Sequence, residues 1–272
     1  MTSRLTVGNG LDRSECSGKE ADLMLKDFEI KRKVLVKYNG KSKNPVIPEG
    51  VKKIGPDAFA SAKIETVSIP ETVTEICENA FIGSDLKEVT IPKSVEHIGE
   101  GAFGLCEHLK TFTVLNGKMN FGTKGINFVF CANKSLSEVN LPDDMPRATG
   151  FLSSAGKLKS IKLLPTETEI KPMAFYSCAS LSEVIIPEGV TKIGASAFMD
   201  CTSLRKIVLP EGLTEIEDKA FSGCVRLKTV VIPKSLKKIG ANSFEDCFKL
   251  GARTIAKLDK VEEIVYTKGE WY

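Results

Sequence analysis

The stretch from Pro187 to Leu227, PEGVTKIGASAFMDCTSLRKIVLPEGLTEIEDKAFSGCVRL, contains the same pattern twice in succession. One piece of it, GVTKIGASAF at Gly189–Phe198, has a close copy far upstream, GVKKIGPDAF at Gly50–Phe59. The other piece, LRKIVLP at Leu204–Pro210, returns one repeat later as LKTVVIP. Self-similarity at a fixed period predicts a repeat architecture in which each coil stacks on the next.

The period can be measured along most of the chain from the apolar residue that closes the second piece. Successive copies are separated by 22, 22, 23, 27, 22, 23, 23, 23 and 23 residues. The copies are Ile47, Ile69, Ile91, Val114, Leu141, Leu163, Ile186, Leu209, Ile232 and Ile255. A constant period places each side chain above its counterpart one coil later, so we predict about nine coils of 22–23 residues.

Three apolar rows follow from this period. The leucine row is Ile64, Leu86, Leu109, Leu136, Leu158, Leu181, Leu204, Leu227 and Leu250. The valine row is Val67, Val89, Phe112, Val139, Ile161, Val184, Ile207 and Val230. The phenylalanine row is Phe59, Phe81, Phe103, Phe128, Phe151, Phe175, Phe198, Phe221 and Phe244. One coil buries too little apolar surface to offset its own ordering entropy, so the coils must share one continuous core.

The composition of each piece predicts its local structure. The L-x-x-V-x-I segments are rich in β-branched residues and end at proline, which favours a short strand that stops there. The V-x-x-I segments predict a second short strand. The Ala-Phe piece is too short for a lasting α-helix and favours a single helical or 3₁₀ turn. The expected fold is therefore a β-rich solenoid of short parallel strands and short turns.

Departures from the repeat at both ends predict capping segments. Residues 1–25 are expected to be a flexible tail. Residues 26–46 are expected to be a hairpin-like cap, because Phe28–Tyr38 alternates like a strand and Asn39-Gly40 is a turn dipeptide. The repeat solenoid then spans residues 47–255, with irregular coils at 115–157. Residues 256–272 are expected to cap the other end, since terminal repeats must shield the core.

The repeat I-P-x-x-V-x-x-I-G-x-x-A-F-x-x-C-x-x-L-x-x-V, in register from Val46 to Ile255, resembles the BspA-type (Treponema pallidum-type) leucine-rich repeat. The leader FEIKRKVLVKYNGKSKNPVIPEGV is similar to the cap of intracellular bacterial members. The resemblance implies a curved, right-handed leucine-rich-repeat solenoid that recognises proteins. It supplies no catalytic residues, and some members of the family are surface adhesins.

Charge and hydropathy exclude several partners. The 38 basic and 35 acidic residues leave a net charge of +3, too small to favour nucleic acid or an anionic membrane. No segment reaches the roughly 20 apolar residues of a membrane span. The first residues lack the apolar stretch of an export signal, which predicts a cytoplasmic protein. A surface or secreted location is the alternative if the chain is a processed fragment.

Six of the eight cysteines lie three residues after a row phenylalanine: Cys106, Cys131, Cys178, Cys201, Cys224 and Cys247. They are expected to stack coil on coil. Because Ala62 and Ser154 occupy the same column, we interpret it as a slot for a small side chain rather than a disulfide ladder. The chain has no C-x-x-C pair, so we expect no metal site and no cofactor.

The two histidines, His97 and His108, are expected on the surface, where other coils carry polar residues. A nucleophile pair of Cys106 and His108 would make the protein a thiol-dependent enzyme. Against this alternative, the repeat predicts that Cys106 points inward. Family and pattern both favour a chain that is not an enzyme.

One outward-facing column changes character along the chain. It follows the valine row by one residue, so strand alternation turns it away from the core. Its first members are polar and its last are β-branched: Ser68, Thr90, Thr113, Asn140 and Lys162, then Ile185, Val208 and Val231. We hypothesise that the apolar end anchors a partner or a second copy of the chain. The alternative is ordinary strand propensity on a half-exposed sheet.

The irregular middle is a second candidate. The 27-residue interval carries Leu115–Phe130, and the next coil, Pro142–Gly156, has lost the V-x-x-I pattern. Insertions in solenoids map to loops, often on the binding face. Met119, Phe121 and Met145 are therefore candidate exposed contacts. In the alternative, Phe121 and Met145 still fill the core of a decayed repeat.

Together these observations predict a non-enzymatic protein–protein interaction module, a scaffold inside a bacterial cell. The binding residues expected are Ile185, Val208, Val231, Lys162, Met119, Phe121 and Met145. The alternatives are a surface adhesin or effector that binds host or matrix protein, and the thiol-dependent enzyme. The sequence leaves the partner's identity and self-association open.

Overall fold

The computed structural model describes residues 26–118, 120–121, 129–258, 261 and 263–265. The chain divides into two compact units, residues 1–145 and 146–272, which we call unit 1 and unit 2. Each unit is a stack of β-solenoid coils, as the repeat predicts, and each is described by itself.

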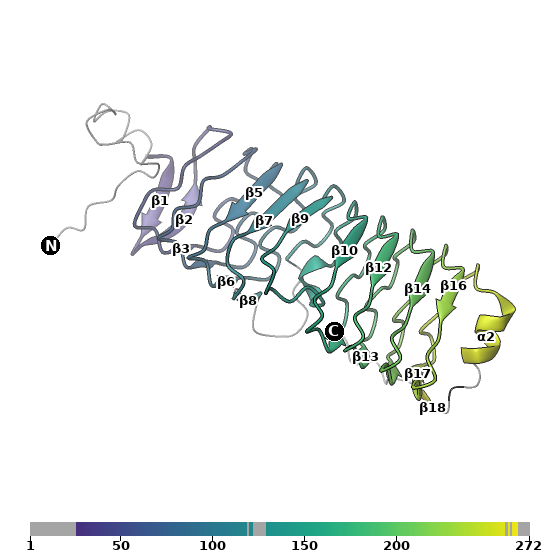
Figure 1. The fold of residues 1–272 in the computed structure, drawn as a ribbon. Helices are drawn as coiled ribbons and strands as arrows, with labels where there is room; N and C mark the ends of the chain where they lie inside the picture. The colour runs from purple at the N-terminus through teal and green to yellow at the C-terminus, as the bar shows by residue number, and fades with distance from the viewer. Residues whose placement is uncertain (1–25, 119, 122–128, 259–260, 262, 266–272) are drawn as a thin grey trace. The chain divides into compact units, whose positions relative to one another are not determined.

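Unit 1 carries two sheets whose strands come from successive coils (Figure 1). The first has the order β1 (Phe28–Lys31), β2 (Val34–Tyr38), β3 (Lys53–Ile54), β4 (Glu75–Ile76), β6 (His97–Ile98), β8 (Asn120–Phe121). The second has the order β5 (Glu88–Ile91), β7 (Thr111–Val114), β9 (Glu138–Asn140). All pairs beyond the first hairpin are parallel and join residues one coil apart, such as Val89 with Phe112.

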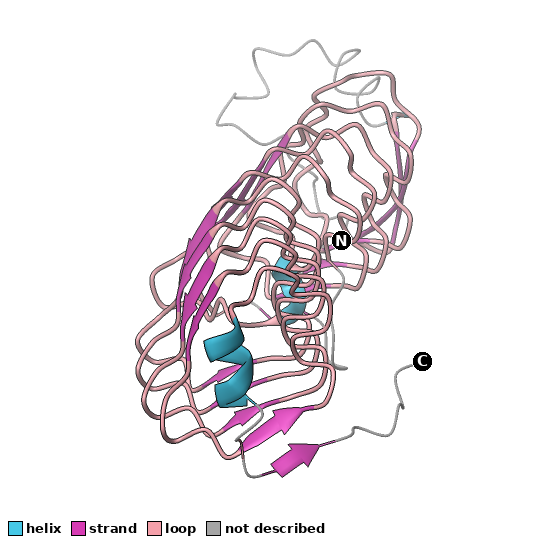
Figure 2. Ribbon diagram, turned by 90° about the vertical axis from the view of Figure 1, so that its right-hand side faces the viewer, coloured by secondary structure: helices cyan, strands magenta, loops and turns pink. Residues whose placement is uncertain are grey.

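Unit 2 repeats this plan with shorter ladders. The L-x-x-V-x-I strands pair as β10 (Ser160–Lys162) with β12 (Glu183–Ile185), and β14 (Lys206–Val208) with β16 (Thr229–Val231). The V-x-x-I strands form β11 (Glu169–Ile170), β13 (Lys192–Ile193), β15 (Glu215–Ile216), β17 (Lys238–Gly240), β18 (Glu263–Val265). The described helices are the 3₁₀ turn η1 (Gly150–Leu152) and α2 (Ala252–Leu258). Figure 2 shows the strands on two separate sides of the coils, with loops between them.

The apolar rows form the core of both units. The leucine row is buried from Ile64 to Leu227. In unit 1 the rings of Phe59, Phe81 and Phe103 stack with centroids 4.8 and 5.0 Å apart. In unit 2 the rings of Phe175 and Phe198 stack at 5.2 Å. Because each ring contacts its neighbours one coil away, stability is shared along the stack.

The Ala-Phe piece is a chain of tight turns in most coils, not the helical or 3₁₀ turn expected from its length. A residue with left-handed backbone lies two positions after each core phenylalanine or its replacement and interrupts any helix. These residues are Ser61, Gly83, Leu105, Ala132, Ser154, Ser177, Asp200, Gly223 and Asp246. Among the described coils these turns keep i→i+3 hydrogen bonds, such as that from the Ala62 N–H to the Phe59 carbonyl, and at η1 they form the 3₁₀ helix expected.

The left-handed residues also correct the phenylalanine row. Ala132 follows Phe130 by two positions, so Phe130 occupies the row and Phe128, which lies outside the described residues, does not. The ring of Phe130 lies 6.3 Å from that of Phe103. The prediction was wrong because the longer interval places its extra residues before the turn, which shifts the row.

The same shift occurs at the start of unit 2. Ser154 follows Leu152 by two positions, and the thiol of Cys178 donates to the Leu152 carbonyl at 3.2 Å. In the other coils of unit 2 this acceptor is a row phenylalanine, as when Cys201 donates to Phe175. Leu152 therefore takes the row position, and the buried Phe151 takes the place of the preceding alanine.

These shifts move two residues out of the cysteine column. Asn133 replaces Cys131 in it, because the Asn133 side-chain amide donates to the Phe103 carbonyl at 2.8 Å, as Cys106 donates to Phe81 at 3.1 Å. Ala155 replaces Ser154 by the same register. The interpretation of the column as a slot for small side chains stands, but its membership was wrong at these two coils.

The N-terminal hairpin reverses earlier than the turn dipeptide indicates. β1 and β2 pair antiparallel, and the turn is at Arg32 and Lys33, whose φ values are 49° and 66°. β2 then pairs in parallel with β3, and the Tyr38 ring stacks on Phe59 at 5.1 Å. The hairpin thus covers the first coil with both backbone and ring contacts.

The coil that lost its V-x-x-I pattern is held by a carboxylate. Met145 takes the valine position with 1% of its surface exposed, so the expectation of an exposed contact there is wrong. One coil later Glu167 takes the valine position and is buried. It accepts hydrogen bonds from the backbone N–H groups of Arg147 and Ala148 at 2.7 and 3.1 Å. Within its described residues this coil forms no strand, and these bonds supplement a backbone bond that it keeps to the next coil, from the Lys171 N–H to the Ala148 carbonyl at 2.9 Å.

Candidate protein-binding surface

The outward side of β10, β12, β14 and β16, which we call the strand face of unit 2, carries the apolar end of the polar-to-apolar column (Figure 1). Exposure alternates along these strands, and Ile185, Val208 and Val231 are 74%, 49% and 44% exposed. Val208 pairs with Val231, and Ile185 with Lys162. We call Ile185, Val208 and Val231 the apolar strip. Its outward orientation is as predicted.

From Ser68 to Asn140 the same column in unit 1 is polar, and at its end it makes a side-chain hydrogen bond of its own. Thr90 pairs with Thr113, and Thr113 with Asn140, across β5, β7 and β9. The Asn140 amide donates to the Thr113 hydroxyl at 3.2 Å and to the Glu138 carboxylate at 3.0 Å. Strand geometry alone therefore does not require apolar residues at these outward positions.

Two hollows flank Ile185 on the strand face. The first, of about 650 Å³, lies between β10 and β12 and is lined mainly by apolar groups, including Ile161, Leu163, Pro165 and Pro187. The second, of about 930 Å³, extends over β12 and β14 and is lined by Lys159, Arg205, Lys206, Arg226 and Val208, among others. Glu183 and Glu188 border both. Volumes in this range can receive side chains of a ligand.

The strand face of unit 2 is rich in cations. The outward positions of β10 to β16 and the residues just before these strands hold Lys159, Lys162, Arg205, Lys206 and Lys228, all exposed, against the single carboxylate of Glu183. Among the described residues of this face no ion pair joins any of them. A partner that supplied carboxylates would meet charges that the protein itself leaves unpaired.

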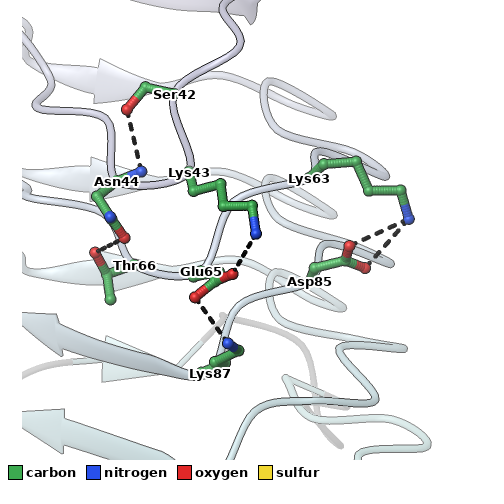
Figure 3. A network of polar contacts seen from close by, with 8 residues as sticks. All are labelled: Ser42, Lys43, Asn44, Lys63, Glu65, Thr66, Asp85 and Lys87. Atoms are coloured by element: carbon green, nitrogen blue, oxygen red, sulfur yellow. Dashed lines mark hydrogen bonds and ion pairs between the residues drawn. The ribbon is translucent and has the colours of Figure 1, made fainter.

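Unit 1 pairs most of its charges at the corresponding place on its first coils (Figure 3), although Lys110 further along makes no such pair within the described residues. Glu65 accepts from Lys43 at 2.8 Å and from Lys87 at 2.7 Å, and Lys63 pairs with Asp85 at 3.2 Å. The two ammonium groups lower the pKa of Glu65 to about 2. Each pair joins residues one coil apart, so the ladder is built by the repeat itself.

The V-x-x-I sheets also pair their charges internally. In unit 2 Lys192 bonds to Glu215 at 3.5 Å and to Glu217 at 2.5 Å, and these carboxylates raise the pKa of the lysine. In unit 1 Lys53 bonds to Glu75 at 2.5 Å. The strand face of unit 2 is therefore distinguished from these surfaces by cations without such pairing.

The seven thiols in the described part of the chain lack the features of a reactive cysteine, and Cys16 lies outside it. Burial raises the pKa of Cys77 and Cys106 to about 11 and that of Cys178 to about 12, and it also raises the pKa of Cys131. A nucleophilic thiol needs the opposite shift, since the thiolate is the reacting form. These directions argue against a thiol-dependent enzyme.

The histidines and Cys106 are not assembled into a pair. His97 and His108 are exposed, as predicted, whereas Cys106 is fully buried. The Cys106 thiol donates to the Phe81 carbonyl and lies 3.4 Å from the Ser84 hydroxyl. Within the described residues no group of three histidine, cysteine or acidic side chains could hold a metal ion.

The remaining predicted contacts fall in the irregular middle. Met119 lies outside the described residues. The backbone of Phe121 pairs in register with Ile98, through β8 and β6. With Met145 buried, the predicted residues whose side chains are described on one face are Lys162, Ile185, Val208 and Val231.

The cations around the apolar strip were missed by the sequence prediction, although a signal existed. Lys159, Arg205 and Lys228 directly follow a leucine-row residue, at a position occupied by Glu65, Lys87 and Lys110 upstream. Reading that column along with the apolar one would have shown a local excess of positive charge. No described helix is long and apolar enough to cross a membrane.

Comparisons with known proteins follow the same repeat. Residues 29–150 and 126–251 match the family described as BspA type leucine rich repeat region, in six copies. A comparison with curated proteins finds no match. Among solved structures, the chain is similar to a leucine rich cell surface protein from Faecalibacterium prausnitzii A2-165, with 24% identity over 89% of this chain and 93% of that chain and a TM-score of 0.34.

Two further solved structures are similar. A leucine-rich repeat protein from Bacteroides ovatus ATCC 8483 is 26% identical over 83% of this chain and 76% of that chain, with a TM-score of 0.39. The leucine rich repeat protein of T. pallidum is 19% identical over 90% of this chain and 96% of that chain, with a TM-score of 0.32.

Proposed function

Because this chain belongs to the BspA type leucine rich repeat family, we propose that it is a non-enzymatic interaction scaffold whose protein partner binds the strand face of unit 2. The apolar strip carries this proposal. Three successive coils present β-branched side chains to solvent at a position that is polar on four successive coils of unit 1, from Ser68 to Asn140, and holds the half-buried Val46 on the first. Contiguous apolar surface with a polar rim is typical of protein interaction sites.

The energetics of the strip support an anchoring role. Ile185 is 74% exposed, so a partner that covers it removes most of its surface from water. Fully burying such a side chain stabilises a complex by roughly 1.5–3 kcal/mol. A few well-buried residues, surrounded by groups that exclude water, usually supply most of the affinity of an interface.

The proposal is tested by affinity capture from a lysate of the source cell, with three versions of the full chain. The strip variant is Ile185→Lys, Val208→Glu, Val231→Lys. The matched control changes the same column in unit 1: Thr90→Lys, Thr113→Glu, Asn140→Lys. Both variants change the net charge by the same amount, because each adds two lysines and one glutamate at neutral positions, and circular dichroism checks that both fold.

We expect a protein that the wild type and the control retain and that the strip variant loses. A partner that all three retain would refute the strand face as the site. A partner lost only by the control would place binding on unit 1 instead.

We propose further that the chain works in a reducing compartment, as expected for the cytoplasm. The buried thiols of Cys178, Cys201, Cys224 and Cys247 support this, because each donates its proton to a carbonyl one coil away. A disulfide would remove these donors. Protein isolated without reductant should contain only free thiols at these positions, and a disulfide found there by mass spectrometry would contradict the proposal.

A further inference from the structure

We propose that the partner presents an acidic peptide segment with an apolar side chain, and that this segment binds across Ile185. The apolar side chain enters the smaller hollow, and the carboxylates face the cations of the larger one. This inference rests on the proposed function, since it specifies the chemistry of the partner at the same strand face.

The lining of the smaller hollow determines which apolar side chain of the ligand can bind there. Its apolar lining comes from two adjacent coils: Ile161, Leu163 and Pro165 from one, Val184 and Pro187 from the next. Ile185 forms part of the same hollow, and Lys162 supplies the basic group in its lining. An aliphatic or aromatic side chain fits this chemistry, whereas a charged one would be desolvated with only one cation near it.

The lining of the larger hollow determines which charged groups of the ligand can bind there. Lys159, Arg205, Lys206 and Arg226 line it, and each is exposed. Arginine presents a planar fork of donors that matches a carboxylate, so two arginines favour acidic side chains over a neutral polar surface. Glu183 and Glu188 border the hollow and would repel carboxylates placed near β12, which directs them toward Arg205 and Arg226.

Within the described residues, the cations that line the larger hollow make no ion pair with a carboxylate of the protein. In unit 1 and in the V-x-x-I sheets, carboxylates one coil away pair several of the lysines, as Glu65 does with Lys43 and Lys87. On the strand face of unit 2 the described residues include no such pair. Charge complementarity of this kind chiefly sets specificity and the rate of association.

A peptide segment fits this face better than nucleic acid or membrane. Proteins that bind single-stranded nucleic acid stack bases on aromatic side chains, and the outward residues of β10, β12, β14 and β16 include none. Membrane-binding surfaces insert long or aromatic side chains such as Leu, Phe and Trp. The apolar strip consists of short β-branched residues instead.

The test selects random dodecapeptides displayed on phage against the immobilised full chain. Selected peptides are synthesised, and their affinity is measured for four proteins. These are the wild type, the strip variant, Arg205→Glu/Arg226→Glu, and a control of equal charge change in unit 1, Lys110→Glu/Lys134→Glu. The wild type is also offered single-stranded oligothymidylate and phosphatidylserine vesicles.

We expect selected peptides to combine acidic residues with at least one large apolar residue. Their affinity should fall at least about tenfold with Arg205→Glu/Arg226→Glu and stay within about twofold with the unit 1 control. Binding should weaken as added salt shortens the Debye length from about 30 Å to about 3 Å.

Four results would overturn the inference. Peptides without acidic residues, or an affinity unchanged by Arg205→Glu/Arg226→Glu, would leave the strand face as the site but remove its acidic ligand. Peptides that bind the strip variant as tightly as wild type would instead refute the proposed function. If the wild type bound oligothymidylate or the vesicles more tightly than every selected peptide, the partner would be a nucleic acid or a membrane instead of a peptide.

Discussion

At the scale of single residues, the side chains of the cysteine column both pack in the core and donate hydrogen bonds to the backbone. Cys201, Cys224 and Cys247 are buried, and each thiol donates at 3.2 Å to the carbonyl of the phenylalanine one coil before its own. Asn133 makes the equivalent bond with its amide at 2.8 Å. This column therefore accepts only small or narrow side chains. Where the side chain has a hydrogen-bond donor, as in Cys and Asn, it pairs with a buried backbone carbonyl.

The first prediction concerns pH and the buried thiol of Cys178. Burial raises its pKa from 9.0 to about 12, so between these values the unfolded chain loses a proton that the folded chain keeps. The free energy of unfolding therefore falls as pH rises above 9, by roughly 1.4 kcal/mol per pH unit from this thiol. Below pH 8 the thiol contributes no pH dependence.

The measurement is guanidinium unfolding of wild type and Cys178→Ala at pH 8 and pH 10. Lysines and tyrosines titrate in the same range, so only the difference between the two proteins reports on Cys178. Between pH 8 and pH 10, the free energy of unfolding of Cys178→Ala should fall by about 1.4 kcal/mol less than that of wild type. Equal losses would show that the thiol titrates normally.

Much of this residue-level detail was readable from the sequence, because the period assigns each core row. The two errors, Phe128 and Phe151, arose from counting forward from the phenylalanine row through coils of altered length. Counting back from the leucine row would have avoided them. Asn133 precedes Leu136 by three residues, as Cys178 precedes Leu181. The leucine row lies beyond the inserted residues, so it keeps the register that the phenylalanine row loses.

At the scale of elements, close approach between coils explains the glycine that follows the V-x-x-I strand. A Cβ added at Gly194 would lie 2.5 Å from the backbone nitrogen of Pro172, one coil before. At Gly240 it would lie 2.3 Å from the nitrogen of Asp218. Atoms cannot approach this closely, and the obstructing atoms are backbone, so the coils would have to separate.

The second prediction follows from this geometry. Gly194→Ala should lower the free energy of unfolding by roughly 1–3 kcal/mol, the usual cost of forcing an extra methyl group into a packed site. Gly251→Ala is the matched control, because nothing lies within 4 Å of its added Cβ, and it should change stability by less than about 0.5 kcal/mol. Equal effects in urea unfolding would refute the close-approach argument.

The third prediction sets the repeat pattern against the structure at Glu167. Glu167→Val restores the repeat residue, which by pattern alone should stabilise the coil. The structure predicts the opposite, because the backbone N–H groups of Arg147 and Ala148 lose their acceptor. We expect a loss of roughly 1–3 kcal/mol.

Urea unfolding checks this prediction, with Thr166→Val as a control at an exposed neighbour. The control should leave stability nearly unchanged. If Glu167→Val is as stable as wild type or more so, the carboxylate does not hold the irregular coil. The sequence predicted that this coil is irregular, but not what replaces its strand, because the acceptor comes from the following coil.

At the scale of the whole molecule, the net charge of +3 conceals an uneven distribution. In unit 1, Lys43, Lys63 and Lys87 pair with carboxylates one coil away, whereas within the described part of unit 2 no ion pair joins the five cations around the apolar strip. The sequence predicted the strip itself, because alternation assigns Ile185, Val208 and Val231 to the outward side. It did not predict the positive charge around the strip. Ion pairing depends on contacts between coils, and the net charge of the chain does not report these contacts.

The central claim is that a protein partner contacts the strand face of unit 2, and site-specific photocrosslinking in the source cell tests it most directly. A benzophenone amino acid replaces Ile185 in one version of the chain and Thr113, its counterpart in unit 1, in another. Both positions point outward, so both proteins should fold as judged by circular dichroism. We predict a discrete protein adduct from position 185 and none from position 113. An adduct from position 113 alone, or from neither position, would contradict the claim.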